Sequence, residues 1–393
     1  MTNTVENNRI KSKTKLKNKS LVASNKMPFD MPFFILTILL LTIGVTMMFS
    51  ASYAFARYDA RYQDSFYFIK RQLPFAVVGV IVMLIVSKID YHKLHKLALP
   101  VLGITYFLLI LVLLLPERNN VHRWIEIPGG LGTIQPSEIA KFAVVLFFAH
   151  YIAHYSNKMG KFKVGVLPFV IILGSIAVLM LLEPHLSGTI LILIIGATMM
   201  LVGGTKIRWF GLVGVLAIVA IIYMVLSGKI GYAMERIEMW IDPFKDFQGD
   251  GWQTVQSLYA ISSGGLLGVG FGQSTQKFMY ISEPQNDFVF AVVCEELGFV
   301  GATIIIIFFA LLIWRGFVIA MKAQDKFGAF LAMGLTVQVG IQTILNIAVV
   351  TNSIPNTGIS LPFFSYGGTA LMMLLVQMGI ILNISRSAVM EKD

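Results

Sequence analysis

The stretch NDFVFAVVCEELGFVGATIIIIFFALLIWR, residues 286–315, decides what kind of fold this chain can have. Its second half has no charged side chain until the final arginine, and about 20 such apolar residues suffice to cross a membrane as a helix. Its first half carries Asp287, Glu295 and Glu296, and Glu283 lies just before it. Charged groups are costly near a membrane interior, so these carboxylates need a physical explanation.

The composition extends the membrane interpretation to the whole chain. Of 393 residues, 56% are hydrophobic and 13% are charged, and the mean hydropathy is +0.76. A soluble domain carries about a quarter charged residues. The sequence therefore predicts an all-α polytopic integral membrane protein. The single cysteine, Cys294, excludes an intramolecular disulfide and a cysteine-based metal site.

The first 30 residues are polar and basic, with seven of the 31 Lys and Arg residues of the chain. This composition predicts a disordered cytoplasmic tail that is attracted to anionic lipids, and it accounts for much of the +10 net charge without nucleic-acid binding. A signal peptide is excluded because the next apolar run is too long and no small-residue cleavage site follows it. We expect a basic tail at 1–30, a transmembrane domain at 31–386 and a cytoplasmic C-terminal tail at 387–393.

Ten apolar runs are long enough to span a membrane. They are residues 32–54, 72–88, 97–115, 138–155, 166–182, 187–203, 207–228, 286–315, 328–351 and 363–384. With the N-terminus inside, 20 Lys and Arg residues fall in cytoplasmic segments and 10 in external ones, while Lys141 lies within a span. This bias predicts about ten helices with both termini cytoplasmic. The large external loop, residues 229–286, then joins spans seven and eight.

A short amphipathic helix at the outer interface is predicted inside this loop. The residues expected to share its apolar face are Val255, Leu258, Tyr259 and Ser262, with Gln253 and Gln256 opposite. The glycine-rich segment 264–272 should end the helix as a flexible or re-entrant turn. Its GVGFG sequence lacks the strand and the following helix that a dinucleotide site requires.

Polar side chains also interrupt the spans. Glu138 and Lys141 are three residues apart on one helix face, where they can pair, either as a structural ion pair or as the wall of a polar cavity. Gln338, Gln342 and Asn346 recur every four residues and form a polar stripe. The stripe fits interhelical hydrogen bonding and a substrate groove equally well.

Two further polar segments lie at the outer edge of the spans. NSIPNTGISLPFFSYGG, residues 352–368, is rich in proline, glycine and hydroxyl residues. Non-helical backbone at that depth is tolerated only beside protein or a water-filled cavity. We therefore expect this segment to form a wall of an outward-facing cleft, with Ser365 as a candidate substrate contact. The turn LLEPHLSGT, residues 181–189, carries His185, which we interpret as an interfacial residue.

The carboxylates at the start of span eight have different explanations. Asp287 suits a helix N-cap, because a carboxylate there favours the helix dipole. Asn286 suits the same position and would leave Asp287 free for chemistry, so the spacing leaves both interpretations open. Glu295 lies about two turns deeper. We expect Glu295 and Glu296 to pair within the bundle and Glu283 to be a solvated loop residue.

Five segments, taken together, resemble one family. They are RWIEIPGGLGTIQPSEIAK at 123–141, EPHLSGT at 183–189, WIDPFKDFQGDGWQTVQSLYAISSGGLLGVGFGQSTQK at 240–277, YISEPQNDFVFAVVCEELGFVG at 280–301 and NTGISLPFFSYGG at 356–368. In this order they resemble the SEDS proteins (shape, elongation, division and sporulation), typified by FtsW, RodA and SpoVE. The resemblance covers roughly residues 30 to 386 and is greatest to the FtsW/SpoVE branch.

The resemblance implies a peptidoglycan glycosyltransferase that polymerises lipid II outside the cytoplasmic membrane. It also implies a class B penicillin-binding protein as partner, other divisome membrane proteins, and a place at the division septum. The family's essential acidic residue matches Asp287, and its Glu and Lys of the QPSE element match Glu138 and Lys141. Many relatives have Asp in a PDLGT element where this chain has PHLSGT, so no acidic role is transferred to His185.

The implied chemistry suits these residues. A sugar hydroxyl that attacks an anomeric carbon needs a base, and a partly desolvated carboxylate such as Asp287 is a better base than a solvated one. The departing pyrophosphate needs positive charge. Arg123, Arg236 and Lys277 lie in external segments and are candidates to supply it, and Mg²⁺ or Mn²⁺ carried by the pyrophosphate is another option. We expect no covalent cofactor and no metal held by the protein alone.

Two other functions compete with polymerisation. A lipid II flippase would also need many spans and a polar path, although the polar complexity here is concentrated outside and no inverted repeat is evident. A non-catalytic scaffold for division proteins is the second. Within the family, the division role is favoured over the sporulation and elongation versions of the same polymerase.

Overall fold

The structure is a computed structural model that describes residues 29–116, 123–126, 133–211, 214, 238–246, 249 and 251–387. Its elements are α2 (Met31–Tyr58), α3 (Tyr67–Val86), α4 (His92–Leu114), β1 (Ile125–Glu126), β2 (Thr133–Ile134), α5 (Pro136–Tyr155), η1 (Ser156–Lys158), α6 (Phe162–Gly165), α7 (Leu167–Leu182), α8 (Leu186–Val202), α11 (Trp252–Gly264), α12 (Val289–Met321), α13 (Lys326–Val350) and α14 (Gly368–Ser387). The two short strands pair antiparallel, with Ile125 opposite Ile134.

The predicted all-α membrane fold is confirmed. In the described part of the chain, eight helices are long and apolar enough to cross a membrane, and α8 is a shorter apolar helix. Most of the predicted span 207–228 lies outside the described residues. Arg236, residues 1–28 of the basic tail and residues 388–393 lie entirely outside them.

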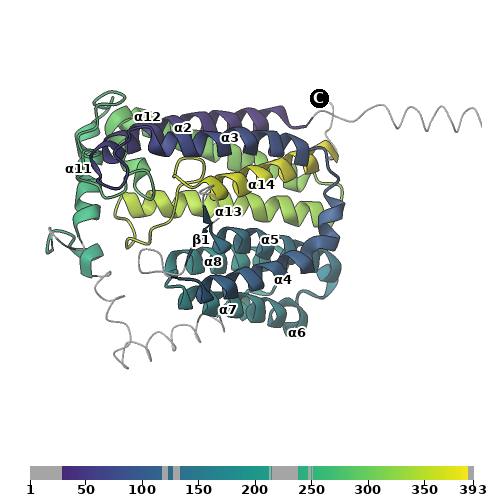
Figure 1. The fold of residues 1–393 in the computed structure, drawn as a ribbon. Coiled ribbons are helices and arrows are strands. Elements are labelled where there is room, and N and C mark those ends of the chain that lie inside the picture. The colour runs from purple at the N-terminus through teal and green to yellow at the C-terminus, as the bar shows by residue number, and fades with distance from the viewer. Residues whose placement is uncertain are drawn as a thin grey trace, which may run out of the picture.

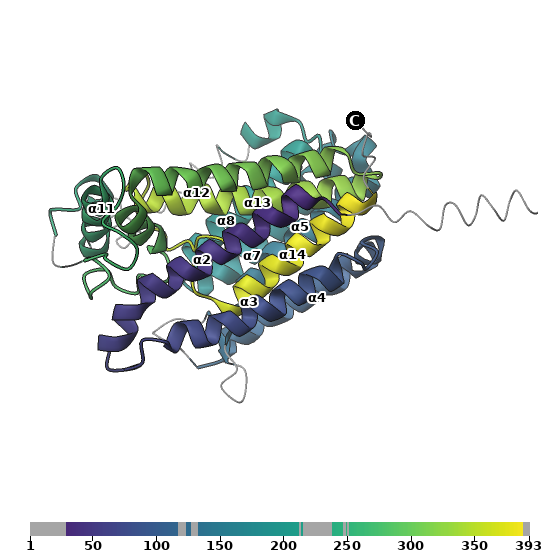
Figure 2. The same cartoon turned by 90° about the horizontal axis from the view of Figure 1, so that it is seen from above.

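The helices run side by side, with α5 and α13 in the middle of the bundle (Figures 1 and 2). Many large apolar side chains of the outer helices α3, α4 and α12 are exposed. Exposed apolar surface of this extent is expected where helices face lipid. The core therefore consists of the inward faces, and the outward faces are suited to a bilayer.

The two ends of the described chain meet at one end of the bundle. The backbone N–H of Asp30 donates to Ser385 Oγ at 3.0 Å, and Arg315 Nη2 lies 2.7 Å from Asp30 Oδ2. The Asp30 side chain also caps α2 by accepting from the N–H of Phe33. Figure 1 shows α11 at the opposite end. This arrangement agrees with the predicted placement of both termini on the same side of the membrane.

Helix α12 is longer than the membrane requires. It ends at Met321 rather than at residue 315, and its 33 residues give a length of about 50 Å, against about 30 Å of hydrocarbon. Part of α12 therefore extends beyond the hydrocarbon layer. Helix α14 starts at Gly368, five residues later than predicted, because the preceding segment is a loop that bonds to other elements.

A break in α12 joins it to the glycine-rich turn after α11. Gly298 has φ +67°, and a Cβ there would lie 2.2 Å from the backbone nitrogen of Gly268, so glycine is required. The N–H of Val269 donates to the carbonyl of Glu295 at 3.0 Å. The N–H of Phe299 donates to the carbonyl of Gly265 at 2.9 Å. The turn thus satisfies backbone groups that the break leaves unpaired.

The predicted short helix exists as α11, but its two faces do not divide as expected. Val255 and Gln256, placed on opposite faces, are 0% and 3% exposed, whereas Tyr259 is 43% exposed. The inward side packs closely on its neighbours. A Cβ on Gly264 would lie 2.0 Å from the carbonyl oxygen of Cys294, and Ser257 Oγ donates to the carbonyl of Val350 at 2.8 Å.

Candidate functional site

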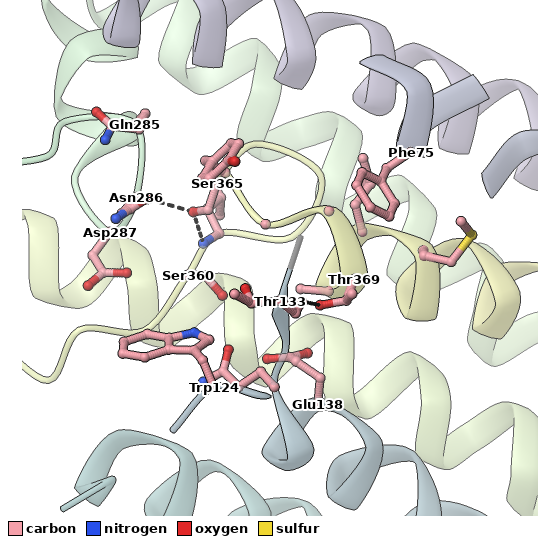
Figure 3. Close-up of a pocket in the computed structure, with 18 of the residues that line it drawn as sticks. Phe75, Trp124, Thr133, Glu138, Gln285, Asn286, Asp287, Ser360, Ser365 and Thr369 are labelled. Carbon is pink, nitrogen blue, oxygen red and sulfur yellow. Dashed lines mark hydrogen bonds between the residues drawn. The ribbon is translucent and has the colours of Figure 1, made fainter. Parts of the chain in front are cut away.

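A large cavity has a volume of about 1200 Å³ and is lined from α3, α5, α8, α13, α14 and the non-helical segments between helices. Five predicted site residues line it, and they are Arg123, Glu138, Lys141, Asp287 and Ser365. Figure 3 shows Asp287 and Glu138 on different elements that border this space. Among the remaining predicted residues, Lys277 lies elsewhere and Arg236 falls outside the described residues.

The carboxylate of Asp287 does not join elements of the described structure. It makes no hydrogen bond or ion pair with the described residues. The N-cap of α12 is Phe288, without a side-chain hydrogen bond, so the capping interpretation of Asp287 is wrong. Asn286 is not the cap either, because its amide donates to Glu283 Oε2 at 2.8 Å. Asp287 is therefore available to a molecule in the cavity.

Burial raises the pKa of Asp287 to about 6, and the charge of Glu283 adds to this effect while Arg123 opposes it. The wall beside the carboxylate is the backbone of Gly358, whose φ is +66°. A Cβ at this glycine would lie 3.0 Å from Asp287 Oδ2. Glycine thus allows the loop to approach the carboxylate without filling the space around it.

The polar stripe of α13 mostly joins elements together. Asn346 Nδ2 donates to the carbonyls of Asp287 at 2.8 Å and Ile359 at 2.6 Å, so it fixes the start of α12 against the loop before α14. Gln338 donates to Gln377 at 3.1 Å. Of the two interpretations of the stripe, hydrogen bonding between segments therefore describes these two residues.

Glu138 and Lys141 form the predicted pair, with Lys141 Nζ 2.7 Å from Glu138 Oε2. Lys141, 4% exposed, also donates to Gln342 Oε1 at 3.1 Å. Gln342 in turn donates to the carbonyl of Ser360 at 2.9 Å. Both interpretations of the pair hold, because it links α5 to α13 and also lines the cavity.

Arg123 and His185 form a neighbouring part of the wall. Arg123 Nε donates to the carbonyl of Glu183 at 3.4 Å, and its Nη2 donates to the carbonyl of Pro184. His185, which we interpreted as an interfacial residue, is 8% exposed and lines the cavity. Burial, followed by the charges of Arg123 and Lys141, lowers the pKa of His185 to about 3. His185 is therefore a neutral side chain at physiological pH.

Ser365 lines the cavity, but its hydroxyl is engaged. It accepts from the N–H of Leu361 at 2.7 Å and donates to the carbonyl of Asn286 at 2.6 Å (Figure 3). These bonds attach the loop before α14 to the segment that holds Asp287. The geometry therefore favours a positioning role for Ser365 over direct contact with a substrate.

Lys277 lies in a buried ion pair away from the cavity. It is 3% exposed, and its Nζ lies 2.8 Å from Glu296 Oε1 and 3.2 Å from Ser50 Oγ. It therefore cannot present its charge to a pyrophosphate in the large cavity. Glu295 accepts from Ser274 Oγ and from the N–H of Thr275. The expected pairing is confirmed for Glu296, whereas Glu295 is held by hydrogen bonds from the loop after α11.

Sequence reasoning missed the cations of α3. Lys70 and Arg71 both line the cavity, and the Arg71 guanidinium lies 3.9 Å from the centre of the Tyr67 ring. The predicted span starts at residue 72 and leaves both cations in the preceding loop, whereas α3 starts at Tyr67. The same helix contributes apolar side chains to the cavity, as does α14. These apolar lining residues are Phe75, Val78, Leu371 and Met372.

Comparison with known proteins identifies the family. The family model for the cell cycle proteins FtsW, RodA and SpoVE matches residues 31–389. The chain belongs to the FtsW/RodA/SpoVE family. It is 41% identical over 371 residues to stage V sporulation protein E of Bacillus subtilis, covering 93% of this chain and 99% of that protein. It is 36% identical over 360 residues to a probable peptidoglycan glycosyltransferase FtsW of a Geobacter species, covering 91% and 96%.

Solved structures of FtsW/RodA/SpoVE relatives share the fold. One chain comes from a peptidoglycan synthase complex that coordinates polymerization and crosslinking. It is 25% identical to this chain with a TM-score of 0.74, and the match covers 91% of this chain and 98% of that one. The rod shape determining protein RodA of Thermus thermophilus is 24% identical with a TM-score of 0.66, covering 92% and 98%. The protein is therefore a multi-pass membrane protein with the fold of this family.

Proposed function

We propose that this chain is a peptidoglycan glycosyltransferase that polymerises lipid II on the outer face of the cytoplasmic membrane. The observation that carries the proposal is the carboxylate of Asp287, which has no hydrogen-bond or ion-pair partner among the described residues and lies in the wall of a large cavity with both polar and apolar lining. A lipid-linked sugar needs this combination, because its sugar and pyrophosphate are polar and its lipid is not. The curated relatives named as probable peptidoglycan glycosyltransferases support the assignment.

The reaction follows from the groups around the cavity. Asp287 takes the proton from the attacking sugar hydroxyl. The hydroxyl oxygen bonds to the anomeric carbon as the bond from that carbon to the phosphate oxygen breaks, and the electron pair leaves with the lipid pyrophosphate. Arg123, Lys70 and Arg71 place positive charge on the walls that would face this leaving group. The apolar side chains of α3 and α14 suit the lipid.

A divalent cation fits this chemistry as a companion of the substrate. The described residues contain no group of three His, Cys, Asp or Glu side chains placed to hold a metal ion. Mg²⁺ or Mn²⁺ would therefore be held mainly by pyrophosphate oxygens and water, and it would neutralise charge on the leaving group.

The test is polymerisation of lipid II by the purified protein in detergent, with its penicillin-binding partner present. We expect glycan polymer, inhibition by EDTA, and recovery with Mg²⁺ or Mn²⁺. No polymer in detergent, together with lipid II movement across the bilayer of vesicles, would support a flippase instead. Polymer formation that EDTA leaves unchanged would remove the divalent cation from the proposal.

The rate of polymerisation should depend on pH through Asp287. A general base must be ionised, so kcat/KM should fall about tenfold per pH unit below a pH near the raised pKa of about 6. A pH–rate profile between pH 4.5 and 8, at constant ionic strength, measures this slope. A rate that stays constant down to pH 4.5 would contradict the assignment of Asp287 as the base.

We propose that the protein works at the division septum with a class B penicillin-binding protein and other divisome membrane proteins. Its similarity to a chain of a complex that coordinates polymerization and crosslinking supports such a partner. The 41% identity to a stage V sporulation protein supports a sporulation role as the second candidate. Depletion followed by microscopy distinguishes them: filaments indicate division, a spore defect with normal growth indicates sporulation, and spheres indicate elongation.

A further inference from the structure

A second, smaller cavity adjoins the same aspartate. Its volume is about 340 Å³, and it shares Glu283, Asn286 and Asp287 with the large cavity. The segment 283–287 therefore borders both spaces. The volume equals that of about ten waters in the liquid, which is roughly the size of one sugar unit.

The second cavity is built from external segments. Its wall comes from the outer end of α2, the turn after α2, the start of α11 and the loop before α12. Arg61 and Gln253 both line it. Figure 1 places α11 at the end of the bundle opposite the termini. This cavity thus faces the external side, whereas the large one reaches the apolar faces of α3 and α14.

The lining offers groups that recognise sugars. Gln253 and Ser282 make no hydrogen bond with the described residues, so an amide and a hydroxyl remain available. Arg61 is held by Asp59, with Nη2 and Oδ2 2.8 Å apart, and the same Nη2 lies 3.8 Å from Glu283 Oε1. Phe55 and Phe288 add apolar surface. The lining therefore combines apolar and polar groups, as in most ligand-binding pockets.

The loop that forms this wall is held in an unusual conformation. Met279 has φ +69° and Glu283 has φ +51°, values that side-chain-bearing residues rarely adopt. Trp252 Nε1 donates to the carbonyl of Tyr280 at 2.6 Å, and the N–H of Asn286 donates to the carbonyl of Glu283 at 3.0 Å. Such backbone persists where surrounding contacts enforce it, often beside bound ligands.

We propose that the second cavity is a saccharide subsite on the exit side of Asp287, which holds a sugar that joined the growing glycan strand in an earlier coupling. This inference rests on the proposed function. The polymer gains its new bond at Asp287, and its finished part must leave toward the outside. Of the two cavities that meet at Asp287, the second is the one walled by external loops.

Strand length separates this role from general catalysis. The first coupling of two lipid-linked disaccharides involves no finished strand, whereas each later step does. Gln253→Ala should therefore shorten the glycan strands about fivefold, the effect of losing roughly one hydrogen bond, and leave the first coupling within about twofold of wild type. Ser282→Trp, which fills the cavity, should stop the polymer at shorter products still. The matched controls are Gln273→Ala and Ser262→Trp, at exposed positions that line neither cavity.

Gel separation of fluorescent polymer measures strand length, and short incubations measure the first coupling. Strands of wild-type length in both variants would overturn the subsite. An equal fall in first coupling and elongation would also overturn it. Absence of polymer with the wild-type protein would instead overturn the proposed function, and the subsite with it.

A binding measurement tests the subsite without catalysis. The one natural cysteine, Cys294, is buried, so Ser282→Cys introduces an accessible thiol for a maleimide. A lipid-free peptidoglycan glycan fragment should slow labelling at position 282 and leave labelling of Gln273→Cys unchanged. Equal labelling rates at position 282 with and without the fragment would contradict the proposal.

Discussion

Replacing Asp287 with asparagine will lower the rate of lipid II polymerisation by about 10²- to 10⁴-fold, the range that a general base contributes. The amide has nearly the same size, but it cannot accept the proton of the attacking hydroxyl. The carboxylate makes no hydrogen bond or ion pair with the described residues, so little of the fold depends on it. The measurement is the initial rate of polymer formation by the protein in complex with its partner.

The same replacement should raise the thermal stability. The folded pKa of Asp287, about 6, lies above the ordinary aspartate pKa of 3.8, so folding favours the protonated form. The stabilising contribution of this group is therefore complete below about pH 3.8 and is lost as the pH rises through 6. Above pH 6 the ionised carboxylate destabilises the fold, and Asn removes that effect.

Opposite changes in rate and melting temperature distinguish a catalytic residue from a structural one. Asp242→Asn, at an exposed external position that lines neither cavity, is the matched control and should change neither quantity. A folded Asp287→Asn protein that polymerises at the wild-type rate would show that another group is the base. A parallel loss of activity and stability would show that Asp287 supports the fold instead.

Replacing Lys277 with methionine will destabilise the protein by about 3–5 kcal/mol, because it leaves the carboxylate of Glu296 buried without its counter-charge. The side chains of both residues are almost completely buried, and Ser50 is the other side chain bonded to that carboxylate. The double variant Lys277→Met with Glu296→Gln should recover most of the loss, because no buried charge then remains. Thermal unfolding in detergent, followed by size-exclusion chromatography, measures both.

Lys245→Met is the control for this pair. Lys245 and Glu238 form an ion pair, 3.2 Å apart, with both side chains more than half exposed, and such pairs contribute about 0–1 kcal/mol. A Lys277→Met protein as stable as the control would contradict the importance of the buried pair. Polymerisation by the double variant at the wild-type rate is also expected, since Lys277 does not line the cavity.

The membrane fold and the main candidate were predictable for local reasons. A span is recognised from about 20 consecutive apolar residues, and its orientation from the charges of its neighbouring loops. The pairing of Glu138 with Lys141 was predictable too, because two side chains that are three residues apart lie on the same face of a helix. Family resemblance added Asp287, for which the spacing alone had left capping and chemistry open.

The errors concern contacts between segments that are distant in the chain. Lys277 looked like a free external cation, yet its partner Ser50 is 227 residues away. Ser365 looked like a free hydroxyl, yet it bonds to a carbonyl 79 residues away. The inward face of α11 could not be read from apolar side chains alone, because it buries the polar residues Thr254, Gln256 and Ser257 as well as Val255.

By itself the sequence determined that this is a polytopic helical membrane protein of one family, with several acidic and basic side chains in its external segments. Only the tertiary structure decided which of those charges are free. A membrane-spanning segment is recognised from the hydrophobicity of neighbouring residues, which can be read directly from the sequence. A charge is free or engaged according to the groups that folding brings against it: Glu296 meets a lysine, whereas Asp287 faces two cavities.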